Sequence, residues 1–330
     1  MQENNDGRES RSRQQAAARR RPTVLVLTTL GPNGMGGIDR LTDGIRRHCA
    51  TAVPDLELIF LTTRGPGLLL LSPLYSLRAA LLLIWYRLTR GRSVCHVNLS
   101  SRGSTIRKLA LSWLARHLGH ATVIHLHGSR FREYFQGVGA LQRRAIIHMF
   151  QEARTVIVLG QVWRDFVRAS FNLDDSRLLV LPNATDARPI EQAREETPPL
   201  ILFLGRIGIR KGVPVLLTAL AALAKTKLAW RAEIAGDGDI APYLAAAEAS
   251  GLTGRVVFPG WLPESEAHAR LSRAAVLVLP SEAEGLPISI IEAFAWGIPV
   301  IATPVGSIPD ILQNENQGFV VPVGDSAALA

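Results

Sequence analysis

The most informative part of this sequence reads Pro280-Ser281-Glu282-Ala283-Glu284-Gly285-Leu286-Pro287. The apolar residues 275–279 precede it and predict a buried strand that ends where this stretch begins. Gly285 permits a tight turn, and Pro287 suits the first position of a new helix. A strand, a polar loop and a helix start in this order place Glu284 beside backbone N–H groups and the positive end of a helix dipole. Such a position favours a ligand with an anionic end and hydroxyl groups, and Glu292, two helical turns on, can reach another part of it.

Apolar segments that are typical of strands alternate with helical segments along the whole chain. The expected strands are 23–30, 56–61, 94–97, 121–126, 155–159 and 178–181, followed by 200–204, 230–235, 256–258, 275–279, 299–302 and 318–321. Near-continuous apolar strands separated by helices predict parallel sheets that are covered on both faces. We therefore expect an α/β protein with two Rossmann-like, doubly wound parallel-sheet domains that face a cleft and bind ligands at the carboxyl edges of their strands.

Polar segments mark the expected domain boundaries. Residues 1–21 are basic and carry almost no large apolar side chains, so we expect a disordered arm. Residues 22–186 and 200–330 are the two expected domains, and residues 187–199 form a polar linker with little apolar periodicity. The apolar run 23–30 is too short for the hydrophobic region of a signal peptide and fits a first strand better, so we expect a cytoplasmic protein.

Length, cysteine content and charge narrow the class of protein. A chain of 330 residues with 47% hydrophobic and 20% charged residues is typical of a soluble α/β protein with two domains. The only cysteines, Cys49 and Cys95, exclude a disulfide framework and a cysteine-based metal site and indicate a reducing compartment. The net charge of +9 is uneven: residues 1–196 carry +12 and residues 197–330 carry −3. Because RNA-binding signatures are absent, this asymmetry favours an anionic membrane surface or a phosphorylated acceptor over nucleic acid.

One leucine-rich segment, residues 68–90, departs from the alternation of strands and helices. It contains the apolar runs 68–71 and 81–86, and arginines follow at positions 87, 90 and 92. This pattern is more typical of an amphipathic helix lying at a membrane interface than of a spanning helix. A helix that faces the core of the first domain is the alternative.

A glycine-rich loop and a histidine are the candidate site features of the first domain. The loop 31–37 joins the first strand to a helix, and its glycines let backbone N–H groups approach a phosphate, although many such turns are glycine-rich for steric reasons. Asp39 and Arg40 follow it, and we expect them to lie at the cleft on the acceptor side. His127 ends the strand 121–126, where it can donate a hydrogen bond to a sugar hydroxyl or a phosphate. Taken alone, this histidine and His125 are more typical of structural residues, and no third ligand indicates zinc.

Two polar loops of the second domain carry further candidates. Arg206 and Lys211 flank the loop after strand 200–204 and can together hold a diphosphate, since arginine offers a fork of donors and lysine a compact charge. The alternative is a solvated basic turn, and this loop taken in isolation favours that alternative. The segment Asp237-Gly238-Asp239 has the Asp-x-Asp pattern of some metal sites, but it follows an apolar strand, so we interpret it as a structural turn near a nucleotide.

Taken in order, these residues resemble the family-4 retaining glycosyltransferases of the B-type fold. The resemblance covers about residues 23–330, and it is specific because these motifs, each modest alone, occur in the right order. The matching pieces are Gly36-Gly37, His127-Gly128, Val180-Leu181-Pro182-Asn183, Gly205-Arg206 through Lys211-Gly212, Gly236-Asp237-Gly238, Glu284-Gly285-Leu286 with Glu292, Ala293 and Gly297–Ala302, and Gly318–Pro322.

The resemblance implies that the second domain binds a nucleotide sugar. Arg206 and Lys211 would hold its diphosphate, Glu284 would accept hydrogen bonds from the donor sugar hydroxyls, and Glu292 would bind the ribose. Together with His127, which would contact the donor sugar, Arg206, Lys211 and Glu284 form the implied catalytic set. The other implied donor-binding residues are Gly36 and Gly37 of the glycine-rich loop, with Gly37 at the distal phosphate, and Gly285 and Leu286 through their backbone N–H groups.

The implied activity is transfer of a hexosyl group from a UDP-, GDP- or ADP-linked sugar to a glycan or lipid-linked acceptor. The product would be a surface polysaccharide or glycolipid, made in the cytoplasm or at the inner face of the plasma membrane. No cofactor or metal is expected, because preorganised cations can stabilise the leaving diphosphate. No carboxylate is obviously placed as a nucleophile, so we expect retention by front-face attack of the acceptor hydroxyl.

Two features depart from the family pattern. Asp39-Arg40 stands near a position where the family often has a glutamate, which leaves the orientation of the acceptor open. The chain ends at Ala330, where family members usually continue with helices, so we expect 200–330 to lack its final helices. A nucleotide-sugar 2-epimerase of the same fold, and a truncated nucleotide-sugar-binding module without turnover, remain the alternative functions.

Overall fold

The computed structural model describes residues 21–31, 34, 36–187, 197–313 and 315–330. The expected basic arm and most of the expected linker lie outside these residues. The chain divides into two compact units: the first comprises the residues up to Leu126 with Val138–Ile157, and the second comprises His127–Gly137 with Val158–Ala330. The domain boundaries expected at 186 and 200 stay a prediction.

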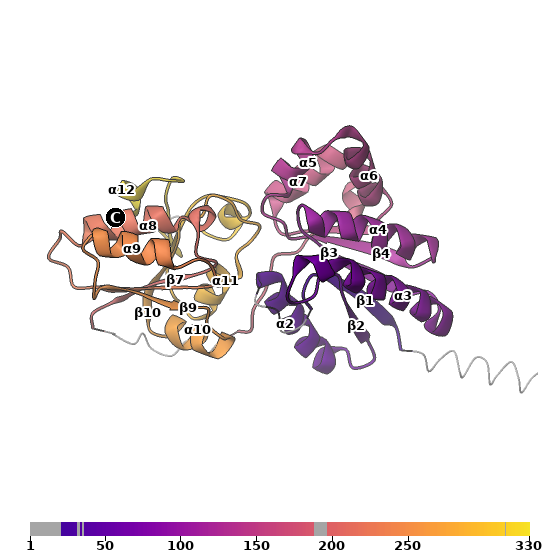
Figure 1. Cartoon of the computed structure of the whole chain (residues 1–330), viewed down its shortest axis with the longest axis horizontal. Helices are drawn as coiled ribbons and strands as arrows, with labels where there is room; N and C mark the ends of the chain where they lie inside the picture. Colours follow the sequence, from indigo (N-terminus) through magenta and orange to yellow (C-terminus); the bar gives the residue numbers. More distant parts are fainter. Residues whose placement is uncertain (1–20, 32–33, 35, 188–196, 314) are drawn as a thin grey trace, which may run out of the picture. The chain divides into compact units, whose positions relative to one another are not determined.

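The first six strands form one sheet in the order β2-β1-β3-β4-β5-β6. Strand β1 pairs in parallel with β2 and β3, and β3 pairs in parallel with β4 (Figure 1). The strands are β1 Thr23–Thr28, β2 Glu57–Thr62, β3 Val94–Leu99, β4 Ala121–Leu126, β5 Thr155–Val158 and β6 Leu178–Val180. The helices between them are α2 Gly37–Ala52, α3 Ser72–Arg90, α4 Gly103–His117, α5 Phe131–Gly137, α6 Ala140–Gln151 and α7 Gln161–Phe171.

The last six strands form a second sheet in the order β12-β11-β10-β7-β8-β9, and all of their pairings are parallel. Helix α8 packs against α9 and α12, and α10 packs against α11, so that helices cover both faces of the sheet (Figure 1). The strands are β7 Leu200–Leu204, β8 Arg231–Ala235, β9 Val256–Gly260, β10 Ala274–Leu279, β11 Val300–Ala302 and β12 Gly318–Val320. The helices are α8 Val213–Leu223, α9 Ala241–Ala249, α10 Glu264–Leu271, α11 Ile288–Ala295 and α12 Ser326–Leu329.

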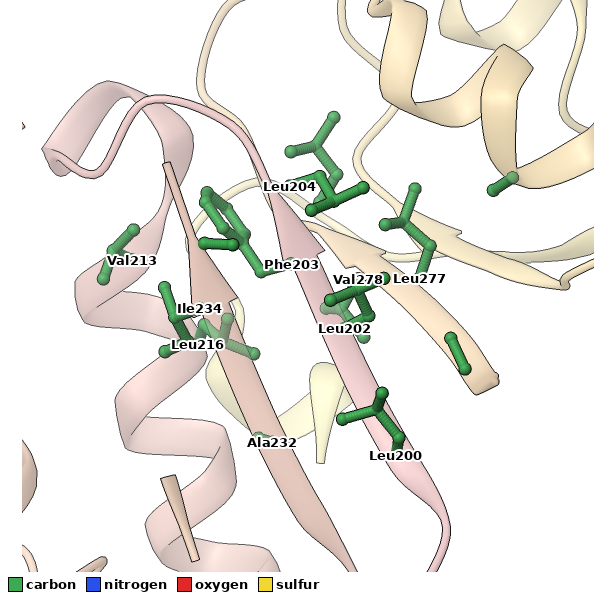
Figure 2. Close-up of a cluster of buried hydrophobic side chains, with 14 of the residues drawn as sticks. Leu200, Leu202, Phe203, Leu204, Val213, Leu216, Ala232, Ile234, Leu277 and Val278 are labelled. Atoms are coloured by element: carbon green, nitrogen blue, oxygen red, sulfur yellow. The ribbon is translucent and has the colours of Figure 1, made fainter. Parts of the chain in front are cut away.

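Each sheet has its own apolar core, built from the strands that the sequence predicted. In the first, Leu25, Leu27 and Val97 are fully buried. In the second, Phe203 and Ile234 lie on the face of the sheet that helix α8 covers, and Val213 and Leu216 of α8 face them (Figure 2). The prediction of an α/β fold with two Rossmann-like parallel sheets is confirmed, and all twelve expected strands are found among the described residues, with ends that differ by one or two residues.

The leucine-rich segment forms a helix with a mostly exposed apolar surface. Helix α3 buries Ala79 and Leu83, whereas Leu77, Leu81 and Leu88 are more than half exposed. Among the described residues one helix, Leu69–Arg90, is long and apolar enough to span a membrane by length and composition alone. The narrow buried stripe matches the core-facing alternative, and the broad exposed surface matches the interfacial one.

Candidate functional site

The order of strands in the second sheet positions two loops next to each other. Strands β7 and β10 are neighbours, but the chain continues from β7 to β8 on one side and from β10 to β11 on the other. At such a switch point the two loops after the strands separate and leave a crevice at the carboxyl edge of the sheet. These loops are residues 205–212 and 280–287, which carry the predicted residues Arg206, Lys211 and Glu284.

A buried ion pair joins the two loops. The ammonium group of Lys211 donates a hydrogen bond of 2.5 Å to Oε1 of Glu284. The side chains are 13% and 7% exposed, respectively, and Nη1 of Arg210 lies 4.0 Å from the other carboxylate oxygen of Glu284. The structure therefore brings together two residues that lie 73 positions apart in the sequence.

Neighbouring hydrogen bonds fix the carboxylate of Glu284. The Ser281 hydroxyl donates to Oε1 of Glu284 at 2.8 Å, and the Thr303 hydroxyl donates to the Ser281 carbonyl at 2.5 Å. The loops are also linked through Arg210, whose guanidinium donates to the Ala283 carbonyl at 3.0 Å. The sequence analysis did not assign a role to Ser281, Thr303 or Arg210, because a single hydroxyl or arginine in a loop carries no distinctive pattern.

Two glycines allow neighbouring segments to approach the loop 280–287 closely. Gly212 has φ +73°, and a Cβ atom there would overlap the carbonyl oxygen of Pro280. Gly306, with φ +60°, packs in the same way against the carbonyl oxygen of Glu284. Both residues combine a left-handed backbone with a close contact, which only glycine tolerates. Close backbone contacts at Gly212 and Gly306 thus hold the segments that carry Lys211 and Glu284 in place.

Arg206 differs from Lys211 in its surroundings. Its side chain is 70% exposed, and its Nε lies 3.8 Å from Oδ2 of Asp237, the first residue of the Asp-x-Asp segment. The second cation of the predicted diphosphate site is thus open to solvent, and Asp237 faces it. Within the described ranges no three histidine, cysteine or acidic side chains gather so that they could hold a metal ion.

The second predicted glutamate lies in a different environment from the first. Helix α11 begins at Ile288, one position after Pro287, and it buries Glu292 to 4% exposure. Oε1 of Glu292 lies 3.8 Å from Nε2 of His268 on α10. The histidine was not singled out in the sequence, and its spacing from Glu292 offers no signal.

Three predicted residues sit around the turn after Glu284. Leu286 is buried, and its carbonyl accepts a hydrogen bond of 2.6 Å from the Asn183 side chain. His127 belongs to the second unit, and its carbonyl oxygen lies 2.8 Å from the point where a Cβ of Gly285 would stand. The absence of a side chain at Gly285 therefore lets the backbone of the His127 segment approach this turn.

The predicted residues of the glycine-rich loop lie in the first unit. Gly36 caps helix α2, and its N–H donates a hydrogen bond of 3.3 Å to Oδ2 of Asp39. Asp39 is 5% exposed, Gly37 is the first residue of α2, and Arg40 is half-buried. Asp39 thus supports the start of the helix, and the roles of these four residues in binding donor or acceptor stay predictions.

A buried lysine that the sequence analysis missed lies in the first unit. Lys108 on α4 is fully buried; its ammonium group donates hydrogen bonds to the Asn98 carbonyl and, at 3.0 Å, to the Ser104 hydroxyl. Burial and, to a smaller extent, the charge of Arg107 lower the pKa of Lys108 to about 7, although Asp39 opposes the shift. One signal was present: Lys108 is the only lysine among residues 1–210.

The fold is that of the B-type glycosyltransferases. Residues 198–330 match the model of the family described as glycosyl transferases group 1. The chain is 33% identical over 221 residues to the putative colanic acid biosynthesis glycosyltransferase WcaL of Escherichia coli K12, an alignment that covers 59% of this chain and 52% of WcaL. The chain thus spans a little over half the length of the curated relatives that it matches.

Solved structures share the whole fold. Sucrose-phosphate synthase of Thermosynechococcus elongatus superimposes with a TM-score of 0.72 at 19% identity, covering 94% of this chain and 88% of that one. Anabaena Alr3699/HepE in complex with UDP-glucose superimposes with a TM-score of 0.71 at 18% identity, covering 93% of this chain and 87% of that one. The resemblance to glycosyltransferases of the B-type fold is thereby confirmed for the fold.

Proposed function

We propose that this chain is a family-4 retaining glycosyltransferase that moves a hexosyl group from a nucleotide-diphosphate sugar to a glycan or lipid-linked acceptor, in the biosynthesis of a surface polysaccharide or glycolipid. The observation that carries the proposal is the buried Lys211–Glu284 pair, which lies where parallel α/β sheets bind ligands. The match of residues 198–330 to glycosyl transferases group 1 supports the same function. UDP-glucose, the ligand of Alr3699/HepE, is the first donor to test, ahead of GDP- and ADP-linked sugars.

Two cations would bind the diphosphate of the donor. Bond cleavage builds negative charge on the leaving diphosphate, and fixed cations that are already in place stabilise it without reorganisation. Lys211 offers a buried charge, and the exposed Arg206 offers a fork of donors that can close over the phosphates. Because these side chains supply the countercharge, we propose a reaction that is independent of metal and of any cofactor.

The carboxylates would bind and orient the sugar and the ribose. In the proposed donor complex the phosphates draw the Lys211 ammonium toward them, and the Glu284 oxygens then accept hydrogen bonds from the donor sugar hydroxyls. Ser281 keeps one of these oxygens in place. Glu292 would accept from the ribose hydroxyls, and His127 would contact the donor sugar. Glu284 then acts as a positioning group, which agrees with retention by front-face attack of the acceptor.

Turnover of nucleotide sugars tests this function. We expect the protein to bind one of UDP, GDP or ADP in a thermal-shift panel and to transfer or slowly hydrolyse the corresponding sugar. Glu284→Ala should remove most of the turnover, whereas Glu248→Ala, at an exposed position on α9, should leave it unchanged. Interconversion of free nucleotide sugars without an acceptor would identify an epimerase, and binding without transfer or hydrolysis would identify a binding module.

We also propose that the protein works in the cytoplasm and docks on an anionic membrane through α3. The helix and the turn before it expose Leu70 by 87%, Leu77 by 57% and Leu88 by 78%. Arginines at positions 78, 87, 90 and 92 lie in and just after this apolar surface, and they complement the charge of anionic lipid headgroups.

Flotation with vesicles tests the membrane proposal. We expect the protein to float with phosphatidylglycerol vesicles at low salt, and Leu77→Glu with Leu81→Glu to weaken the binding at least about tenfold. Leu141→Glu, at an exposed position on α6, is the matched control and should float like the wild type. Equal flotation of all variants, or none by the wild type, would reject a lipid-binding role for α3.

A further inference from the structure

The first sheet has a switch point of its own, and cations gather at it. Strands β1 and β3 are neighbours, but the chain continues from β1 to β2 on one side and from β3 to β4 on the other. Thr29 follows β1 directly; its carbonyl accepts a hydrogen bond of 3.0 Å from the Arg64 N–H. Its hydroxyl accepts one of 3.5 Å from the Lys108 ammonium, which also donates to the carbonyl of Asn98 in β3. Lys108 and the backbone of Arg64 thus meet at the carboxyl edge of β1 and β3.

A third cation belongs to the same cluster. Arg107 precedes Lys108 on α4. Burial and then the charge of Arg107 lower the pKa of Lys108, and burial and then the charge of Arg64 lower the pKa of Arg107. Within the described part of the chain, the Nε atoms of Arg64 and Arg107 are buried and have no hydrogen-bond acceptor. We call Arg64, Arg107 and Lys108 the first-unit cation cluster.

The negative charge within reach of the cluster is smaller than its positive charge. Asp39 is the carboxylate that faces Arg64 and Lys108. Its Oδ2 already accepts a hydrogen bond from Gly36, and burial raises its pKa. Among the described residues, Arg64 and Lys108 thus face one carboxylate whose own charge is disfavoured by burial, and Arg107 adds a third positive charge beside them. Buried guanidinium N–H groups without acceptors cost free energy, which the oxygens of a bound anion would recover.

We propose that Arg64 and Arg107, with Lys108 behind them, bind a phosphate group of the acceptor. This inference rests on the proposed transferase function, in which the donor phosphates occupy the loops of the second unit and the first unit receives the acceptor. Two guanidinium groups match the charge and the oxygen geometry of a phosphate, because arginine donates in a planar fork. Lys108 is too deeply buried to touch the acceptor, so it acts as a positioning residue that adds charge behind the two arginines.

Direct titration with inorganic phosphate tests the site without a donor or an acceptor. The full chain should carry Arg206→Gln and Lys211→Gln, so that the second unit does not bind the probe, and the ionic strength should be held constant with chloride. In this background Arg64→Gln with Arg107→Gln should weaken phosphate binding about tenfold or more. The matched control is Arg46→Gln with Arg47→Gln, which removes the same charge from two exposed residues of α2 and should change the affinity less than about twofold.

Unchanged phosphate affinity in the Arg64/Arg107 variant, or an equal loss in the Arg46/Arg47 control, would overturn the proposal. If the glutamine variant does not fold, Arg64→Lys with Arg107→Lys decides the matter, because it keeps the charge but loses the fork. Roughly threefold weaker binding is then expected, and an affinity equal to that of the parent overturns the proposal.

Two further measurements identify the source of the phosphate and separate this proposal from the transferase function. Binding of glucose 1-phosphate in solution should be compared with binding of phosphatidic acid in vesicles. The ligand that the Arg64→Gln with Arg107→Gln variant binds more weakly than its parent represents the class of acceptor. If the variant binds both ligands as tightly as its parent does, the acceptor role is wrong. UDP binding to the chain with wild-type Arg206 and Lys211 should be unaffected by the same variant. If the wild-type protein binds none of the nucleotides, the transferase function is rejected, but the result of the phosphate titration remains valid.

Discussion

The two switch points differ in how their cations are balanced. In the second sheet, the buried Lys211 is paired with Glu284 at 2.5 Å, and a serine and a threonine fix the carboxylate side of the pair. In the first sheet, Arg64 and Lys108 face Asp39, and Lys108 donates hydrogen bonds to neutral oxygens. A paired cation is kept charged and in place until a ligand exchanges with its partner, whereas an unbalanced cluster keeps an attraction for an anion from outside. The same topology thus yields two cation clusters that differ in how their charge is balanced.

The largest effect is expected from breaking the paired site. Lys211→Ala should lower turnover by about 10²–10³-fold, because it removes a fixed cation from the leaving diphosphate. It should also destabilise the fold by about 3 kcal/mol, since Glu284 would be left buried without its partner. Steady-state kinetics and chemical denaturation measure the two effects, and Lys225→Ala, at an exposed position after α8, is the control.

The double variant Lys211→Ala with Glu284→Ala sharpens this result. It should be more stable than Lys211→Ala alone, because no uncompensated buried charge remains. Its turnover should stay as low as that of the single variant. Strictly additive losses of stability would show that the two side chains do not act as a pair.

An intermediate effect is expected at the first-unit cation cluster, where the buried Lys108 should make the stability of the protein depend on pH. The pKa of Lys108 is about 7 in the folded protein and ordinarily 10.5, so between these values the unfolded chain binds more protons than the folded one. The free energy of unfolding should therefore rise with pH in this window by up to about 1.4 kcal/mol per pH unit relative to Lys108→Met. Denaturation of both proteins at pH 7, 8 and 9 measures the difference, and parallel curves would contradict the assigned burial of the lysine.

The smallest effect concerns the hydroxyl that holds the carboxylate. Ser281→Ala removes the 2.8 Å hydrogen bond to Glu284 and should destabilise the fold by about 1 kcal/mol. If Glu284 positions the donor sugar, the same change should lower kcat more than it raises KM. Ser250→Ala, in an exposed turn after α9, should change neither quantity.

The strands were predictable because each is a short apolar run bounded by polar residues, glycine or proline. Even the start of α11 was found to within one residue, with Pro287 just outside the helix instead of in its first position. The pairing of Lys211 with Glu284 could not be read from spacing, since it depends on β7 and β10 being neighbours in the sheet. Lys211 alone fitted a solvated basic turn as well as a site, whereas the strand, loop and helix start around Glu284 already favoured a ligand.

The first-unit cation cluster escaped prediction for a different reason. The partners of Lys108 are a backbone carbonyl and two hydroxyls, which leave no charge pattern in the sequence. Arg64 and Arg107 come from segments on either side of α3 and meet only because β1 lies between β2 and β3. Asp39 was expected at an acceptor site, and the structure places it beside these cations while its side chain also caps α2.

The contact between Gly212 and the Pro280 carbonyl has a consequence for engineering. Because the second-sheet loops are held against each other by main-chain atoms, the alignment of Lys211 with Glu284 does not depend on a side chain at Gly208 or on the exposed side chain of Ile209. A combinatorial library at these two sites can therefore explore the proposed choice of nucleotide or sugar while Gly212 is kept invariant. Substitution of Gly212 itself would wedge the loops apart and abolish the starting scaffold for any such selection.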